Sequence, residues 1–116
     1  MKIGFLLNTG PYTFENTNTV IRLARAALKK GHECSIFLFV DGIINASKDI
    51  VSPGEKSIPE QFKELSAEGV TVRICGECAK YRGQTRDAVV EGSRQAGIGA
   101  LAEIIANSDR FLTFGF

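Results

Sequence analysis

Four short apolar segments, separated by stretches of helical periodicity, constrain the fold of this chain more than any other feature. Each segment is rich in Ile, Val, Leu or Phe, and most lack the strict polar alternation of a half-exposed strand. Continuous apolar runs suit strands that are covered on both faces, as in a parallel sheet. We therefore predict four buried strands, over residues 2–7, 34–40, 70–75 and 110–114.

The stretches between these strands carry apolar residues at helical spacing. Gly31 provides a stop after the first stretch. Ser57 and Glu60 have capping-box spacing at the start of the second, where Pro59 is tolerated in the first turn. The alternation of strands and helices is typical of an α/β fold with right-handed crossovers. We predict helices over residues 20–28, 57–69 and 98–107.

Two segments are less regular. Residues 46–56 are polar and contain Pro53 and Gly54, which favours a surface loop or a short helix followed by a turn. Residues 81–96 have no clear period, and part of this stretch can form a further short strand or helix. The chain has no linker or internal repeat, so we expect a single α/β domain over residues 1–116. Its sheet should be mostly parallel, with four or five strands and helices on both faces.

Composition and charge exclude several classes of function. Hydrophobic residues make up 44% of the chain and charged residues 23%, as in soluble globular proteins, and the net charge of +1 comes without a basic block. We therefore expect no direct binding to nucleic acid. No segment approaches the roughly 20 apolar residues of a membrane span, and the short apolar run at the start lacks the features of a signal peptide. Three cysteines, an odd number, argue for a reducing compartment, so we expect a cytoplasmic protein without disulfides.

Polar residues gather after the predicted strands, where ligands bind in open α/β sheets. The loop after the first strand lacks the run of glycines or hydroxyls that would cradle a phosphate, which favours a simple polar turn. The Asp-Gly pair after the second strand suits a base or a ligand, but it is also common in turns. The candidate site residues in these two loops are Asn8, Thr9, Gly10, Asp41, Gly42 and Asn45.

Cys75, at the end of the third predicted strand, is the strongest candidate for chemistry. Gly76 allows the backbone to turn and to approach a ligand closely. A helix that begins near Glu77 would direct free N–H groups at the Cys75 sulfur, and Arg82 is a nearby cation. Such donors stabilise a thiolate, and they would hold a persulfide anion in the same way.

The other cysteines admit different interpretations. Cys34 lies within a predicted strand and is expected to be a small core residue, whereas Cys78 either resolves a disulfide or simply packs. A thioredoxin-like redox site would normally follow the first strand rather than the third. A zinc site needs two further ligands, and the single histidine, His32, precedes the second strand at the opposite edge of a parallel sheet. We therefore expect no metal site within the chain.

Several motifs, in order and spacing, resemble the DsrE/DsrF-like sulfur-relay family, and within it the TusD/DsrE type. After the first strand, loop and helix comes an acidic-Gly-hydrophobic-x-Asn-Ala element at residues 41–46. A strand then ends in Cys75, with Arg82 and Gly83 shortly after it. Residues 97–103 read Gly-x-Gly-Ala-Leu-Ala-Glu and precede the last strand. The resemblance covers nearly the whole chain.

The resemblance implies a flavodoxin-like fold and self-association as trimers or hexamers, sometimes with paralogous subunits. It also implies an active cysteine, matching Cys75, that accepts sulfane sulfur as a persulfide from a donor protein and hands it to an acceptor protein. Members of the family serve tRNA thiolation or sulfur oxidation, and some branches lack the cysteine. Cys78 stands where the best-known members often have a small residue, which leaves its role open.

Three functions follow as hypotheses. The leading one is an intracellular sulfurtransferase or sulfur carrier that acts through Cys75, with Gly76, Arg82 and Gly83 in support. Thiol exchange of this kind requires no metal or organic cofactor. The alternatives are a non-catalytic scaffold subunit of a relay oligomer, and a dithiol redox protein that uses Cys75 together with Cys78.

Overall fold

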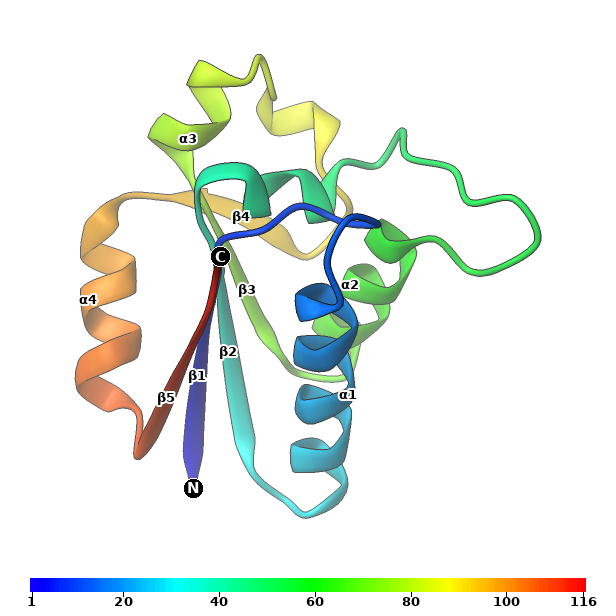
Figure 1. Cartoon of the computed structure of the whole chain (residues 1–116). Coiled ribbons are helices and arrows are strands. Elements are labelled where there is room, and N and C mark those ends of the chain that lie inside the picture. Colours follow the sequence, from blue (N-terminus) through cyan, green and yellow to red (C-terminus); the bar gives the residue numbers. More distant parts are fainter.

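A five-stranded sheet in which all neighbouring strands are parallel forms the centre of the computed structural model, which describes residues 1–116 (Figure 1). The strand order is β4-β3-β2-β1-β5. The prediction of a mostly parallel sheet with four or five strands is confirmed. The strands are β1 (Lys2–Leu7), β2 (Glu33–Leu38), β3 (Thr71–Cys75), β4 (Ser93–Ala96) and β5 (Arg110–Phe114).

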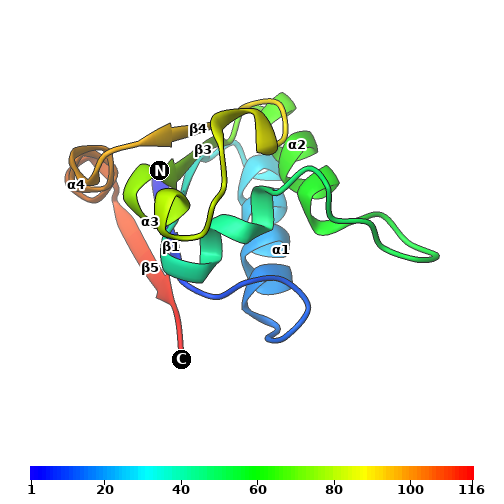
Figure 2. The same ribbon diagram turned by 90° about the horizontal axis from the view of Figure 1, so that it is seen from above.

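Helices cover the two faces of the sheet unequally. Helices α1 (Asn16–Lys29) and α2 (Ile58–Ala67) pack side by side on one face, and α4 (Ile98–Asn107) lies alone on the other (Figure 2). All three predicted helices are present. The bounds of α4 agree with the prediction, α1 begins four residues earlier than predicted, and α2 ends two residues earlier. Ser57 caps α2 by accepting a hydrogen bond from the N–H of Glu60 at 3.3 Å, and Gly31 follows α1 with a φ of 82°.

Three short helices lie beyond the carboxyl ends of the strands. They are the 3-10 helices η1 (Val40–Ala46) and η2 (Arg86–Ala88) and the α-helix α3 (Gly76–Tyr81). The prediction that the second strand runs to residue 40 is wrong, because Val40 has a φ of 45° and leaves the extended conformation. The segment of unclear period, residues 81–96, contains η2 and the additional strand β4.

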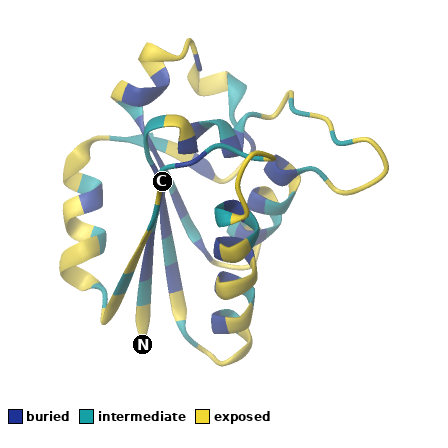
Figure 3. Cartoon of the chain, viewed as in Figure 1, coloured by how far each residue is buried: buried dark blue, intermediate teal, exposed yellow.

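The main core lies between the sheet and the α1–α2 layer. Figure 3 shows that buried residues recur along β1, β2 and β3 in the centre of the sheet. The prediction of a buried strand over residues 110–114 is wrong, since most residues of β5 are exposed. This strand lies at the edge of the sheet and pairs only with β1, so one of its sides meets solvent. The fully buried side chains of the strands include Leu7, Ile36, Phe37, Leu38, Val72 and Ile74.

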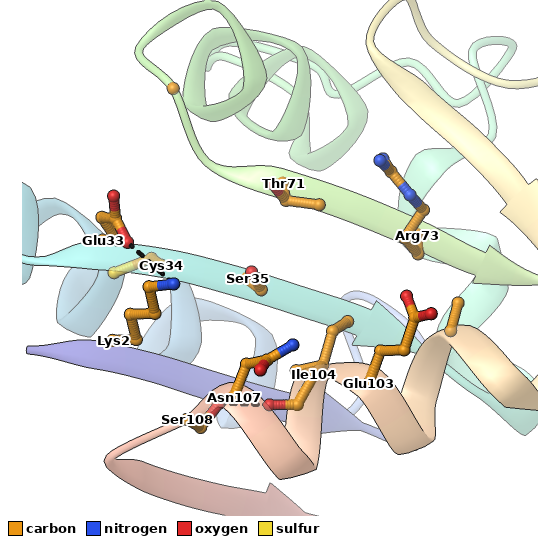
Figure 4. A pocket seen from close by; sticks show the side chains of 12 residues that line it. Lys2, Glu33, Cys34, Ser35, Thr71, Arg73, Glu103, Ile104, Asn107 and Ser108 are labelled. Carbon is orange, nitrogen blue, oxygen red and sulfur yellow. Dashed lines mark hydrogen bonds and ion pairs between the residues drawn. The ribbon is translucent and has the colours of Figure 1, made fainter.

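The face that carries α4 is only partly covered. Gly4 of β1 allows α4 to approach closely, because a Cβ at this position would come within 2.9 Å of Cγ2 of Ile104. Beside this contact a hollow of about 400 Å³ opens between α4 and strands β2 and β3 (Figure 4). Polar side chains, among them Ser35, Thr71 and Arg73, line it, which explains why the inner strands are not apolar on both faces. None of the helices combines the length and apolar character that a membrane crossing requires.

We predict that Gly42→Ala destabilises the protein by about 1–3 kcal/mol or more, because a Cβ at Gly42 would lie 2.0 Å from the carbonyl oxygen of Leu7. The matched control is Gly99→Ala in α4, where nothing lies within 4 Å of the added atom and the helix gains about 0.5–1 kcal/mol. Denaturant unfolding of both variants measures the difference. Equal stability of the two variants would contradict the close approach of η1 to β1.

Candidate functional site

The candidate residues meet at the carboxyl edge of the sheet. The loop after β1, helix η1 after β2 and helix α3 after β3 all lie beyond this edge (Figure 1). Parallel strands end at the same edge, so segments that are far apart in the sequence become neighbours there. Helices α3 and η1 are in direct contact.

Cys75 is the last residue of β3 and the N-cap of α3. Its Sγ accepts a hydrogen bond from the backbone N–H of Cys78, with a sulfur to nitrogen distance of 3.4 Å. Only 5% of the residue is exposed, and it borders a hollow of about 620 Å³. A Cβ at Gly76 would make only ordinary contacts, with the carbonyl oxygen of Ala96 at 3.6 Å. Gly76 is therefore not forced by a close backbone approach, and it forms part of the wall of this hollow.

Residues from four parts of the chain line the hollow at Cys75. It is lined by the end of β2, by α3, by the loop before β4, and by the junction of β4 with α4. Most of these residues were not predicted as site residues, because β4 carries no apolar pattern that would have placed its end beside Cys75. The lining residues are Phe39, Cys75, Gly76, Glu77, Cys78, Lys80, Tyr81, Arg86, Gln95, Ala96, Gly97 and Ile98.

Cys78 lies one helical turn after Cys75 and is also buried, with 8% exposed. Its Sγ accepts a hydrogen bond from the backbone N–H of Val40 at 3.3 Å. Burial raises the pKa of the Cys78 thiol, and a hydrogen bond with the Cys75 side chain raises it further, against smaller opposing effects of the Val40 N–H and the Arg82 charge. Cys78 is therefore held as a thiol in contact with Cys75.

Arg82 joins α3 to η1. Its Nε donates to Oδ1 of Asp41 at 2.8 Å, and its Nη1 donates to the carbonyl oxygen of Cys78 at 3.1 Å. No hydrogen bond connects the guanidinium to the Cys75 sulfur. The Arg82 charge lowers the pKa of Cys78 against the larger effect of burial, and its hydrogen bonds hold α3 in place. Gly83 follows with a φ of 66°, which reverses the chain after α3.

Asn45 is fully buried and links three segments. Its Nδ2 donates to the carbonyl oxygens of Thr9, at 2.9 Å, and Gly42, at 2.8 Å, while its Oδ1 accepts a hydrogen bond from the hydroxyl of Thr17 at 2.9 Å. A buried amide with three bonds to protein partners has little capacity left for a ligand. Asn45 therefore has an architectural role in holding η1 against α1 and the first loop.

The first loop lies beside η1 rather than beside the thiols. The N–H of Asn8 donates to the carbonyl oxygen of Phe114 at 2.9 Å, and the hydroxyl of Thr9 accepts a hydrogen bond from Asn16 at 3.1 Å. A Cβ at Gly10 would lie 3.5 Å from the carbonyl oxygen of Asp41. Of these predicted residues, Thr9 belongs to the Asn45 network, and none of them lines the hollow at Cys75.

The remaining cysteine and the histidine lie elsewhere. Cys34 is a core residue as predicted, and its Sγ is 3.9 Å from the carbonyl oxygen of Ala24. Burial raises the pKa of this thiol. The Nδ1 of His32 is 3.0 Å from the amino group of Met1. The structure contains no group of three or more His, Cys, Asp or Glu side chains placed to hold a metal ion.

The fold and this site define a flavodoxin-like α/β protein with a thiol at the carboxyl end of an inner strand. The model of the DsrE/DsrF-like family matches residues 1–114. The chain therefore belongs to the DsrE/DsrF-like family, as the resemblance in its motifs indicated.

Named relatives agree with this assignment. The chain is 31% identical over 114 residues to the uncharacterized protein MJ0989 of Methanocaldococcus jannaschii, with 98% of this chain and 100% of that protein covered. It is 28% identical over 131 residues to the putative sulfurtransferase DsrE of Allochromatium vinosum, with 99% of each chain covered. It is 31% identical over 125 residues to the sulfurtransferase TusD of Yersinia pestis, with 94% of this chain and 95% of that protein covered.

Solved structures give the same fold. The crystal structure of the YchN protein from E. coli superposes with a TM-score of 0.90 at 25% identity, covering 98% of this chain and 99% of that one. The protein of unknown function MTH1491 from Methanobacterium thermoautotrophicum has a TM-score of 0.77 at 15% identity, over 97% of this chain and 98% of that one. The second likeness concerns the fold alone.

We predict that Asn45→Ala lowers the free energy of unfolding by about 1–3 kcal/mol, because it leaves buried hydrogen-bonding groups of Thr9, Gly42 and Thr17 without their partner. Asn18→Ala is the control, since the Asn18 amide makes only one exposed hydrogen bond, at 3.4 Å. Urea titration followed by circular dichroism gives both values. An Asn45→Ala variant as stable as Asn18→Ala would show that the network is not structural.

Proposed function

We propose that this protein is a sulfur-relay protein in which Cys75 accepts sulfane sulfur as a persulfide and passes it to a partner protein. The observation that carries the proposal is the position of Cys75, at the carboxyl end of β3 and beside a hollow that opens to the surface. Two of the relatives are named as sulfurtransferases, the putative sulfurtransferase DsrE and the sulfurtransferase TusD. Cys34 near the start of β2 does not line this hollow, and its Sγ is 3.9 Å from the carbonyl oxygen of Ala24.

The proposed reaction consists of two thiol exchanges. The Cys75 thiolate attacks the outer sulfur of a donor persulfide, the S–S bond of the donor breaks, and the donor cysteine leaves as a thiolate. An acceptor thiolate then attacks the outer sulfur on Cys75, which leaves Cys75 as a thiolate and the acceptor as a persulfide. The sulfane sulfur is neither oxidised nor reduced overall, so neither step requires a metal or an organic cofactor.

The hydrogen bond from the Cys78 N–H supports Cys75 in both steps. This donor lies 3.4 Å from the Cys75 sulfur, which carries negative charge before the first exchange and again after the second. A fixed donor to a sulfur anion favours both the attacking thiolate and the leaving thiolate. The Arg82 contacts with Asp41 and Cys78 keep α3, and with it this donor, in position.

The central prediction concerns sulfur uptake. Incubation with a persulfide donor should add one sulfur atom to the wild-type chain and to Cys34→Ala, and none to Cys75→Ser. Cys75 borders the open hollow with its sulfur bonded to an N–H donor, whereas burial raises the pKa of the neighbouring Cys78 thiol and disfavours its thiolate. Intact-mass spectrometry after removal of the donor measures the gain. Sulfur that persists on Cys75→Ser would refute the assignment, and a relay that continues unchanged with Cys75→Ala would favour a scaffold role.

Self-association is part of this proposal. Helix α4 is apolar, yet Leu101 is its only buried residue, and Ile98 and Ile105 are exposed on it together with small residues (Figure 3). An exposed apolar face of this kind typically marks an interface. We propose that it contributes to a trimer or hexamer of this chain, or to an assembly with paralogous subunits. The donor and acceptor are thiol proteins, and relays to tRNA thiolation or to sulfur oxidation both fit this chemistry.

We predict that Ile105→Glu reduces the mass of the assembly to that of a smaller species, because it places a charge on the outer face of α4 where 48% of Ile105 is exposed. Leu23→Glu on α1, where 41% of the leucine is exposed, is the control and should leave the mass unchanged. Light scattering coupled to size-exclusion chromatography measures both. The reverse pattern would place the interface on α1.

A further inference from the structure

Two thiols lie in contact within the first turn of α3. Cys75 is the N-cap residue and Cys78 is the third residue of the helix. In a capping box the side chain at each of these two positions reaches the backbone N–H of the other, so the local backbone makes the two residues neighbours. Their proximity is seen in the Cys78 N–H, which lies 3.4 Å from the Cys75 sulfur. The proposed relay uses only the first thiol.

A second backbone donor is directed at the second thiol. Val40 holds its N–H 3.3 Å from the Cys78 sulfur, and it does so with a φ of 45°, a conformation that β-branched residues rarely adopt. Backbone strain of this kind persists where the surroundings enforce it, and it is concentrated at functional sites. Here Gly42 fixes η1 against β1, because only a residue without a Cβ fits beside the Leu7 carbonyl oxygen.

Each sulfur of the pair thus has its own N–H donor. The Cys78 N–H serves Cys75, and the Val40 N–H serves Cys78. A donor at a sulfur that merely fills space would have no chemical consequence, whereas a donor at a reactive sulfur stabilises the thiolate that must form before the attack. The arrangement equips Cys78 to act as a nucleophile toward the sulfur nearest to it, which is the Sγ of Cys75.

Building on the carrier role of Cys75, we propose that Cys78 is a resolving thiol, which attacks the Sγ of the Cys75 persulfide and releases the outer sulfur as hydrogen sulfide. The bond between Cys75 Sγ and the outer sulfur breaks, and a Cys75–Cys78 disulfide forms. The outer sulfur leaves with the bonding electron pair and takes up the proton of the Cys78 thiol. Two electrons pass from the cysteine pair to the sulfane sulfur, which becomes sulfide.

The disulfide closes a cycle that needs a reductant. A dithiol reductant exchanges with the Cys75–Cys78 bond, is itself oxidised to a disulfide, and restores both thiols. Until then the chain cannot accept sulfur, because Cys75 is no longer free. Burial raises the pKa of Cys78, so its thiolate is scarce, and an acceptor thiol that reaches Cys75 competes favourably with the internal release.

The experiment loads the wild-type chain, Cys78→Ser, Cys78→Ala and Cys34→Ala with glutathione persulfide and then removes the donor. Intact mass follows the sulfur on Cys75, a bimane trap follows released sulfide, and peptide mass mapping under non-reducing conditions identifies disulfides. Wild type and Cys34→Ala should lose the sulfur while sulfide and an intramolecular Cys75–Cys78 disulfide appear in equal amounts. Both Cys78 variants should keep the sulfur, with loss of the sulfide signal.

The outcomes separate the release from the carrier role. Wild-type protein that loads but forms no Cys75–Cys78 disulfide overturns the resolving role and leaves the carrier role intact. Release of sulfide from the Cys78 variants as fast as from wild type overturns it as well. Cys78→Ser and Cys78→Ala that take up no sulfur, together with wild-type protein that gains neither sulfur nor a disulfide, overturn the carrier role and the internal release with it. The disulfide mapping uses the wild-type chain, so it does not depend on the stability of any variant.

Discussion

Parallel pairing of all five strands is the constraint on which the rest of this molecule depends. In such a sheet the chain must return from the carboxyl end of one strand to the amino end of the next. Every connecting segment therefore begins at the carboxyl ends of the strands, on the same side of the sheet. In this chain those beginnings are the first loop, η1, α3 and the start of α4. Cys78, the two N–H donors and much of the wall of the hollow come from these segments, and Cys75 directly precedes α3. The site is thus a direct product of the sheet topology.

At the carboxyl ends of the strands, one group of residues holds η1 in place and another group surrounds the two thiols. On the side of β1, the buried amide of Asn45 and the missing side chain of Gly42 fix η1 to the sheet. On the side of β3, the positioned η1 supplies the Val40 N–H to Cys78 and the Asp41 carboxylate to Arg82. The polar residues after the first two strands therefore act on the sulfur chemistry through the position of η1, without touching the hollow.

The sequence predicted most of this fold, and the exceptions have physical causes. Strand β1 and the capped start of α2 were predicted because their signals are local. Strand β4 was not, since its residues Ser93–Ala96 form an edge that needs no apolar side chains. The proximity of Cys75 and Cys78 follows from their spacing in the sequence. The hydrogen bond from the Val40 N–H to the Cys78 sulfur depends on a tertiary contact and on the positive φ of Val40, and no sequence pattern predicts either. Asn45 was predicted as a site residue, but its burial and hydrogen bonds give it an architectural role that the sequence pattern does not indicate.

The unequal coverage of the two sheet faces has a dynamic consequence. On one face α1 and α2 enclose fully buried side chains of β1, β2 and β3, whereas α4 and the exposed edge strand β5 bury little. Local opening costs least where few apolar side chains are buried. The C-terminal quarter of the chain should therefore fray first in an isolated subunit, while the strand that carries Cys75 belongs to the half that opens last. Assembly over α4 would remove this difference and would make the chain open as one unit.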